Sequence, residues 1–192
     1  MKKGFSLLLI VFSIFFYGVN YGTVYANTNS KPRPIEEFFP EFGGYTTAEE
    51  AIKKFEQHFN RDLKLPLRIP PITFTHYLGR FSDLDGDKND TLELKFINED
   101  APENHYKIDV HPVEHKIQIP NKYIIKKVNL KNGNEAIYMQ YSGGWYALVF
   151  ERDNWQYMLS VDERVSDKVT AEVLVEIADS IDYPSEKKNA LP

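Results

Sequence analysis

Three tight-turn dipeptides form the most restrictive pattern in this sequence. They separate runs rich in Tyr, Ile, Val, Leu and Trp between residues 124 and 161. Two-residue turns of this kind require positive φ angles, which Gly and Asn adopt at low cost, and their twist matches that of paired strands. The pattern therefore predicts a four-stranded antiparallel meander. The turn dipeptides are Asn132-Gly133, Gly143-Gly144 and Asp153-Asn154.

Helices are predicted on both sides of this strand-rich region. Thr47 followed by Glu50 is typical of a helix N-terminus, and apolar residues then recur at helical spacing until about Asn60. A second helix begins near Thr170 and stops before Pro184, since proline cannot continue a helix. The apolar stripes consist of Ile52, Phe55 and Phe59 in the first helix, and of Val169, Val173, Ile177 and Ile181 in the second.

Alternation of apolar and polar residues marks two further strands, Leu92–Phe96 and Tyr106–Val110, each with one polar face. Neither an apolar sheet face nor an apolar helix stripe is stable in water, so each must cover the other. The expected fold class is therefore α+β, with an antiparallel β-meander sheet and with an N-terminal helix and a C-terminal helix packed on one face.

The N-terminal residues 1–26 are typical of a secretory signal peptide. Two lysines precede an apolar run, and Val24-Tyr25-Ala26 offers a cleavage site after Ala26. An uncleaved membrane anchor is the alternative, but the apolar run is shorter than the ~20 residues that span a bilayer. The absence of cysteine excludes a lipid-modified cysteine after the signal. We expect a secreted, extracellular protein with no membrane span after signal cleavage.

The remaining chain divides into three parts. Residues 27–44 are predicted to form a flexible tether because many of them are Asn, Ser, Lys and Pro. The aromatic motif at 38–42 either packs on the domain edge or binds a partner. Residues 45–184 form a single α+β domain, and residues 185–192 form a tail. The net charge of −5, without clustered Lys and Arg, argues against nucleic acid as a partner.

The acidic segment at residues 83–94, DLDGDKNDTLEL, partly resembles a calcium-binding EF-hand loop. Lys88 stands where that loop requires Gly, and Leu94 stands where it requires a bidentate Glu. Asp, Asn and Gly are also the residues that ordinary turns use. We expect a hairpin loop, and a weak calcium site of another kind is the alternative. Its weak candidate ligands are Asp83, Asp85, Asp87 and Asn89.

The segment HPVEH at residues 111–115 matches the H-x-x-E-H pattern of helical zinc peptidase sites. In such sites two histidines one helical turn apart bind zinc, and the glutamate acts as a base. Pro112 and the alternating flanks instead predict a strand followed by a turn. The alternatives are a small metal-dependent hydrolase that uses His111, Glu114 and His115, and a metal site that uses His105, Asp109 and His111.

Aromatic side chains of the predicted meander form a third candidate site. Alternation along residues 145–150 places Trp145 and every second residue after it on one face, and Tyr146, Leu148 and Phe150 on the other. Half of these side chains therefore belong to the core. The other half either pack at an edge or offer a platform for a sugar or a lipid.

Several segments together resemble domain of unknown function 4367, a family of exported Gram-positive domains. The resemblance covers about the last 120 residues. The similar segments are LPLRIPPITF at 65–74, which is predicted to be a strand, TLELKF at 91–96, the Asn-Gly turn before AIYMQY, and residues 155–181. The resemblance implies an α+β domain with no known catalysis, although this chain lacks the lipid-modified cysteine and the membrane span of that family.

These observations lead to one expected function and two alternatives. We expect a secreted, non-enzymatic domain without a cofactor, which binds an unknown ligand at the bacterial cell surface or outside the cell. The first alternative is the small metal-dependent hydrolase built on HPVEH. The second is an interaction module that acts through its aromatic N-terminal tether.

Overall fold

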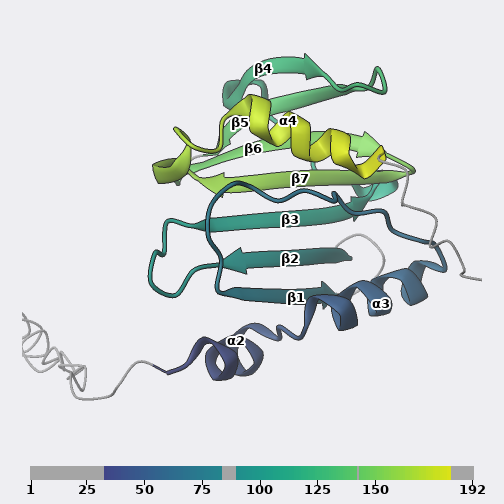
Figure 1. Ribbon diagram of the computed structural model, residues 1–192. Helices are drawn as coiled ribbons and strands as arrows, with labels where there is room; N and C mark the ends of the chain where they lie inside the picture. The colour runs from purple at the N-terminus through teal and green to yellow at the C-terminus, as the bar shows by residue number, and fades with distance from the viewer. Residues whose placement is uncertain (1–32, 84–89, 142, 183–192) are drawn as a thin grey trace, which may run out of the picture. The chain divides into compact units, whose positions relative to one another are not determined.

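Seven antiparallel strands form one sheet in the order β1-β2-β3-β7-β6-β5-β4 (Figure 1). The computed structural model describes residues 33–83, 90–141 and 143–182. The predicted signal peptide and C-terminal tail lie outside these residues. The strands are β1 His76–Ser82, β2 Thr91–Ile97, β3 His105–Pro112, β4 Ile124–Asn129, β5 Glu135–Tyr141, β6 Trp145–Arg152 and β7 Trp155–Asp162.

The sheet consists of two meanders that meet in its middle. Strands β4 to β7 form the predicted four-stranded meander, and strands β1 to β3 form a second one. Positive φ angles occur at the predicted turns, for example 85° at Gly133 and 64° at Asn154. The pairing of β3 with β7, in which Ile108 lies opposite Leu159, joins the two meanders.

Three helices and four short 3-10 helices complete the described structure. Both predicted helices are present: the Thr47 side chain accepts a hydrogen bond from the Glu50 N–H at the start of α3, and Asn60 ends that helix in the left-handed conformation. The elements are α2 Ile35–Gly43, α3 Ala48–Phe59, α4 Ala171–Asp179, η2 Val113–His115, η3 Asn121–Tyr123, η4 Glu163–Val165 and η5 Ser180–Asp182.

Helices α3 and α4 lie on the same side of the sheet, α3 against β1 and β2 and α4 against β6 (Figure 1). We call this side the helix side. It holds the main core, which includes the fully buried Phe55, Leu92, Tyr106 and Trp155. The predicted α+β class, with helices from both ends of the domain on one face, is confirmed. On α4 the buried apolar residues are Ala171, Leu174, Ile177 and Ala178, whereas Val173 of the predicted stripe is only partly buried.

Gly79 in β1 allows α3 to pack closely on the sheet. A Cβ atom at this position would lie 2.7 Å from the Cβ of Ala51 and 2.8 Å from the Cα of Ala48, closer than side chains tolerate. The backbone of Gly79 also exchanges two hydrogen bonds with Thr46, at 2.7 and 2.9 Å. A residue without a side chain is therefore required where the helix crosses the strand.

Two segments for which the sequence predicted a structure have a different one. The expected tether contains helix α2 at Ile35–Gly43, so the prediction of a flexible segment is wrong for these residues. The segment 65–74, read as a strand, is irregular and forms no strand. Its prolines lack the N–H groups that a central strand needs, yet Leu65, Ile72 and Phe74 still pack on the core.

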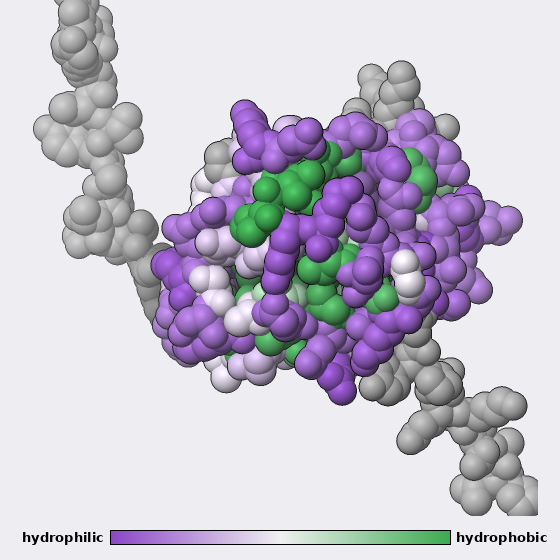
Figure 2. Space-filling view, turned by 90° about the horizontal axis from the view of Figure 1, so that it is seen from above, coloured by the Kyte–Doolittle hydropathy of each residue, from purple (hydrophilic) through white to green (hydrophobic). Residues whose placement is uncertain are grey.

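The β4 edge of the sheet combines apolar and charged side chains. Figure 2, which looks down on this edge, shows green apolar areas divided by purple polar ones. Ile125 is 51% exposed, while Lys126 pairs with Glu172 and Lys127 with Glu135, each at 2.8 Å. Lysines on an edge strand oppose the addition of a further strand. None of the helices among the described residues is both long and apolar enough to cross a membrane.

Candidate functional site

The sheet face opposite the helices, which we call the open face, is divided into a charged half and an apolar half. Alternation along β2 and β3 places Leu92 and Ile108 on the helix side. The residues that directly precede and follow each of them in the chain therefore face the open side. The charged half lies on β1 to β3, and the apolar half lies on β5 and β6, with β7 between them. The apolar cluster consists of the buried Met139, Ala147, Val149 and Met158.

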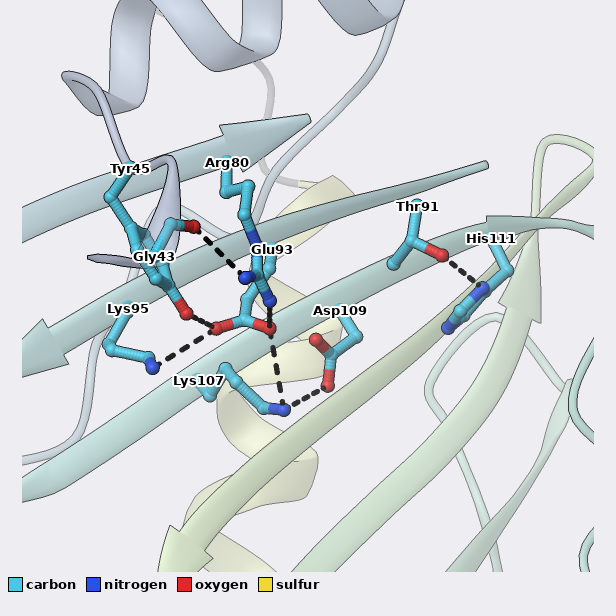
Figure 3. Close-up of polar contacts among 9 residues, drawn as sticks. All are labelled: Gly43, Tyr45, Arg80, Thr91, Glu93, Lys95, Lys107, Asp109 and His111. Atoms are coloured by element: carbon cyan, nitrogen blue, oxygen red, sulfur yellow. Dashed lines mark hydrogen bonds and ion pairs between the residues drawn. The ribbon is translucent and has the colours of Figure 1, made fainter. Parts of the chain in front are cut away.

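Glu93 is the centre of the charged half (Figure 3). Its carboxylate accepts a hydrogen bond from the Tyr45 hydroxyl and from Nη2 of Arg80 at 3.1 Å. The ammonium groups of Lys95 and Lys107 lie 3.2 and 3.8 Å from its two oxygens. Burial alone would raise the pKa of Glu93, but the Tyr45 hydrogen bond and the three cations outweigh it and lower that pKa. Glu93 is therefore a fixed anion.

Tyr45 covers the charged half from the segment between α2 and α3. It is only 5% exposed, and its ring lies against the Arg80 guanidinium at 4.7 Å and the Lys95 ammonium at 4.6 Å. Arg80 also donates a hydrogen bond to the Gly43 carbonyl at 3.1 Å. Burial and the neighbouring Glu93 raise the pKa of Tyr45, so its hydroxyl stays a hydrogen-bond donor. These contacts fix one wall of the site.

A hollow of about 490 Å³ lies between the charged and the apolar half. Its volume is in the range of small-molecule sites. On the far side Ile117 borders it, held by the Gln156 side-chain amide, which accepts from the Ile117 N–H at 2.8 Å and donates to its carbonyl at 3.0 Å. The lining residues are Thr91, Lys95, His105, Lys107, Asp109, His111, Ile117, Tyr141, Trp145, Ala147, Met158 and Ser160.

Asp109 is the acidic group of the hollow. It is 7% exposed and pairs with Lys107, whose ammonium lies 3.1 Å from Oδ2. Burial raises the pKa of Asp109 to about 6, and the cation of Lys107 only partly opposes this effect. Arg80, Lys95 and Lys107 therefore face two carboxylates, of which one is readily protonated, and the charged half carries an excess of positive charge.

Two polar atoms of the residues that line the hollow have no hydrogen-bond partner among the described residues. The buried Ser160 Oγ and His105 Nε2 make no hydrogen bond within the described part of the chain. The His105 ring is held edge-on against Trp145, with ring centroids 4.7 Å apart. Burial and the charges of Lys95 and Lys107 lower the pKa of His105 to about 4, so the imidazole is neutral at physiological pH. A bound molecule with a polar group would satisfy both atoms.

The HPVEH segment has the predicted strand-to-turn structure, in which β3 leads into the short 3-10 helix η2, rather than one continuous α-helix. His111 belongs to β3, where its ring Nδ1 lies 3.0 Å from the Thr91 hydroxyl, whereas Glu114 and His115 belong to η2. His111 lines the hollow, while Glu114 and His115 line a separate cleft beside Pro112. The two histidines thus do not face a common site. His105, Asp109 and His111 do line the same hollow.

The aromatic residues of β6 divide between the two faces as predicted. Trp145 lies at the hollow, while Tyr146 and Phe150 pack on the helix side. Tyr141 of β5 is 45% exposed at the rim of the hollow and stacks on Tyr123 at 5.5 Å. Part of the aromatic group is therefore available to a ligand.

The acidic segment connects β1 with β2, which pair antiparallel with Ser82 opposite Thr91. The expected hairpin connection is therefore present. Asp83 is described and largely exposed. The candidate calcium ligands Asp85, Asp87 and Asn89 lie outside the described residues.

Sequence reasoning missed most of the hollow. Lys95, Lys107 and Ser160 lie on three different strands, and each by itself is an ordinary polar residue of an alternating pattern. The register places Lys95 opposite Lys107, and Lys107 opposite Ser160, in one row across the sheet. The two adjacent lysines of this row indicate a positively charged site, but they can be recognised as adjacent only when the register of the strands is known.

Comparison with protein-family models, with curated proteins and with solved structures found no match to this chain. The resemblance to domain of unknown function 4367 stays a prediction.

Proposed function

We propose that this protein is a secreted, non-enzymatic domain that binds a small amphiphilic anion in the hollow of its open face, at the bacterial cell surface or outside the cell. The observation that carries the proposal is the pair of buried polar atoms in the lining of the hollow, Ser160 Oγ and His105 Nε2, which no described group satisfies. Unsatisfied buried polar atoms reduce stability, so a ligand that pairs with them gains that free energy on binding.

The chemistry of the lining defines the ligand. An anionic group fits beside Lys95 and Lys107, where positive charge is in excess. An apolar or aromatic body fits against Trp145, Ala147 and Met158. A neutral imidazole and a hydroxyl between these two regions favour a ligand with a hydrogen-bonding group. A fatty acid or an aromatic acid has this combination.

The binding proposal predicts that the fluorescent probe 1-anilinonaphthalene-8-sulfonate, an aromatic sulfonate, saturates at one equivalent on the mature protein. Replacing Trp145 with alanine or Lys107 with glutamine should weaken this binding by about tenfold each, about 1.4 kcal/mol, because one removes the aromatic wall and the other a cation. Fluorescence titration at pH 7.5 measures both effects.

Matched control variants lie outside the hollow. Tyr77→Ala removes an aromatic side chain that is 53% exposed on β1, and Lys127→Gln removes an exposed lysine of β4. Both should bind the probe like the unmodified protein. Equal weakening in all four variants, or no saturable binding at all, would contradict a specific site on the open face.

Export is a separate prediction, motivated by the lysine pair, the apolar run and Val24-Tyr25-Ala26. The mature protein should begin at Asn27, since signal peptidase cleaves after a small residue such as Ala26. N-terminal sequencing of protein from the culture medium measures this directly. Recovery of a chain that begins at Met1 from the membrane fraction would instead establish an anchored protein.

A further inference from the structure

Three residues from separate parts of the chain meet on the helix side, at the end of the sheet where β1 and β2 are connected. His58 lies in the last turn of α3, Asp83 directly follows β1, and Asp90 directly precedes β2. The pairing of Ser82 with Thr91 holds the two strand ends together, and α3 packs on both strands. The cluster lies across the sheet from the hollow, since Asp90 is two residues before Leu92 in the chain and faces the helix side with it.

The geometry of the cluster brings one donor atom of each residue within 4.8 Å of the other two. Nε2 of His58 lies 2.8 Å from Oδ2 of Asp90, and Nδ1 lies 3.9 Å from Oδ2 of Asp83. The His58 ring is held between Phe59 and Phe81, with centroids 4.7 and 5.1 Å away. No other group of three His, Asp or Glu side chains within the described ranges approaches this closely.

Asp90 supplies an independent reason to expect a ligand here. Its side chain is only 1% exposed, and neither carboxylate oxygen has a hydrogen-bond partner among the described residues. The approach of His58 Nε2 is close enough for a hydrogen bond but lacks its geometry. A buried carboxylate without donors is strongly destabilising, and buried charges are normally paired or coordinate a metal.

We propose that His58, Asp83 and Asp90 bind a divalent transition-metal cation, with zinc as the reference ion. One imidazole nitrogen and two carboxylates are ligands that zinc accepts, whereas calcium prefers six or more oxygens. The His58 side chain is 29% exposed and also lines a cleft of about 350 Å³ with Arg61, so solvent can enter and complete the coordination. A bound cation would link α3 to the β1–β2 connection and neutralise Asp90.

The experiment uses the mature protein, first stripped of metal with a chelator and then dialysed. Zinc should bind at one equivalent in calorimetry, cobalt should give d–d absorption bands that zinc displaces, and zinc should raise the melting temperature by several degrees. His58→Gln and Asp90→Asn should each weaken zinc binding at least tenfold. His115→Gln, a change in the same cleft but outside the cluster, should bind zinc like the unmodified protein.

The melting temperature of the metal-free protein distinguishes a metal site from an ordinary ion pair between His58 and Asp90. Without metal, Asp90→Asn should melt at the same or a higher temperature than the unmodified protein, because it removes a buried charge that no hydrogen bond within the described residues satisfies. If His58 and Asp90 only form an ion pair, Asp90→Asn melts lower and zinc leaves the unmodified protein unchanged, which overturns the proposal. Zinc binding that survives both His58→Gln and Asp90→Asn, or calcium binding as tight as zinc binding, overturns it as well.

Discussion

Replacing Trp155 with alanine is expected to destabilise the fold by about 3–5 kcal/mol. The side chain is fully buried on the helix side, with the rings of Phe55 and Phe59 at 4.8 and 5.2 Å and the Arg61 guanidinium at 4.8 Å. Alanine would leave a cavity between β7 and α3 that rigid aromatic neighbours cannot fill. Urea unfolding of the protein, followed by circular dichroism, measures the change in the free energy of unfolding.

The second tryptophan provides the matched control. Trp145 is partly exposed at the hollow, so Trp145→Ala removes less buried surface and should cost clearly less than Trp155→Ala. A larger loss at Trp145 than at Trp155 would mean that the core is not centred between β7 and α3.

Replacing Asp109 with asparagine is expected to stabilise the protein above pH 7 by at most about 3 kcal/mol. In the folded protein burial raises the pKa of Asp109 to about 6, from 3.8. Between these pH values the folded state retains a proton that the unfolded state has lost, so the contribution of this group to stability falls as the pH rises from about 4 to 6. Asparagine cannot ionise and avoids the loss. Urea unfolding at pH values from 4 to 8 measures the difference.

Other titratable side chains also change stability with pH, so their effects must be distinguished from that of Asp109. The lowered pKa of His105 acts in the opposite direction, because stability is lost as the pH falls through the titration of that imidazole. It is common to both proteins and cancels in their difference. The Arg164 hydrogen bond lowers the pKa of Asp162, so Asp162→Asn should instead be destabilising above pH 4. A gain at Asp109 that is the same at pH 4 and pH 8 would contradict burial of an ionised carboxylate.

The same features connect stability with the proposed function. Asp109, His105 and Ser160 all lie buried or half-buried on the open face, and each is expected to lower the stability of the domain. Side chains that lower the free energy of unfolding are typical of ligand-binding sites. Variants that stabilise the hollow are therefore the ones in which we expect altered ligand binding.

The sequence by itself determined the local structure. The turn dipeptides predicted β4 to β7 because positive φ angles restrict the residues that fit, and the Thr47 cap predicted the start of α3. Alternation separated Tyr146 from Trp145 correctly, since strand side chains alternate whatever the partner is. Strand β1 was not predicted, and the glycine in its middle, Gly79, is explained only by the helix that crosses it.

Only the tertiary structure decided what the open face is. The pairing of β3 with β7 places Lys107 beside Ser160 and brings the charged strands next to the apolar ones, although about 50 residues of chain separate them. In the same way, the packing of α3 on β1 and β2 brings His58 to Asp90. No local propensity encodes such contacts, because they arise from burial of the apolar faces of distant segments against each other, and the polar residues on the opposite faces are carried into place with them.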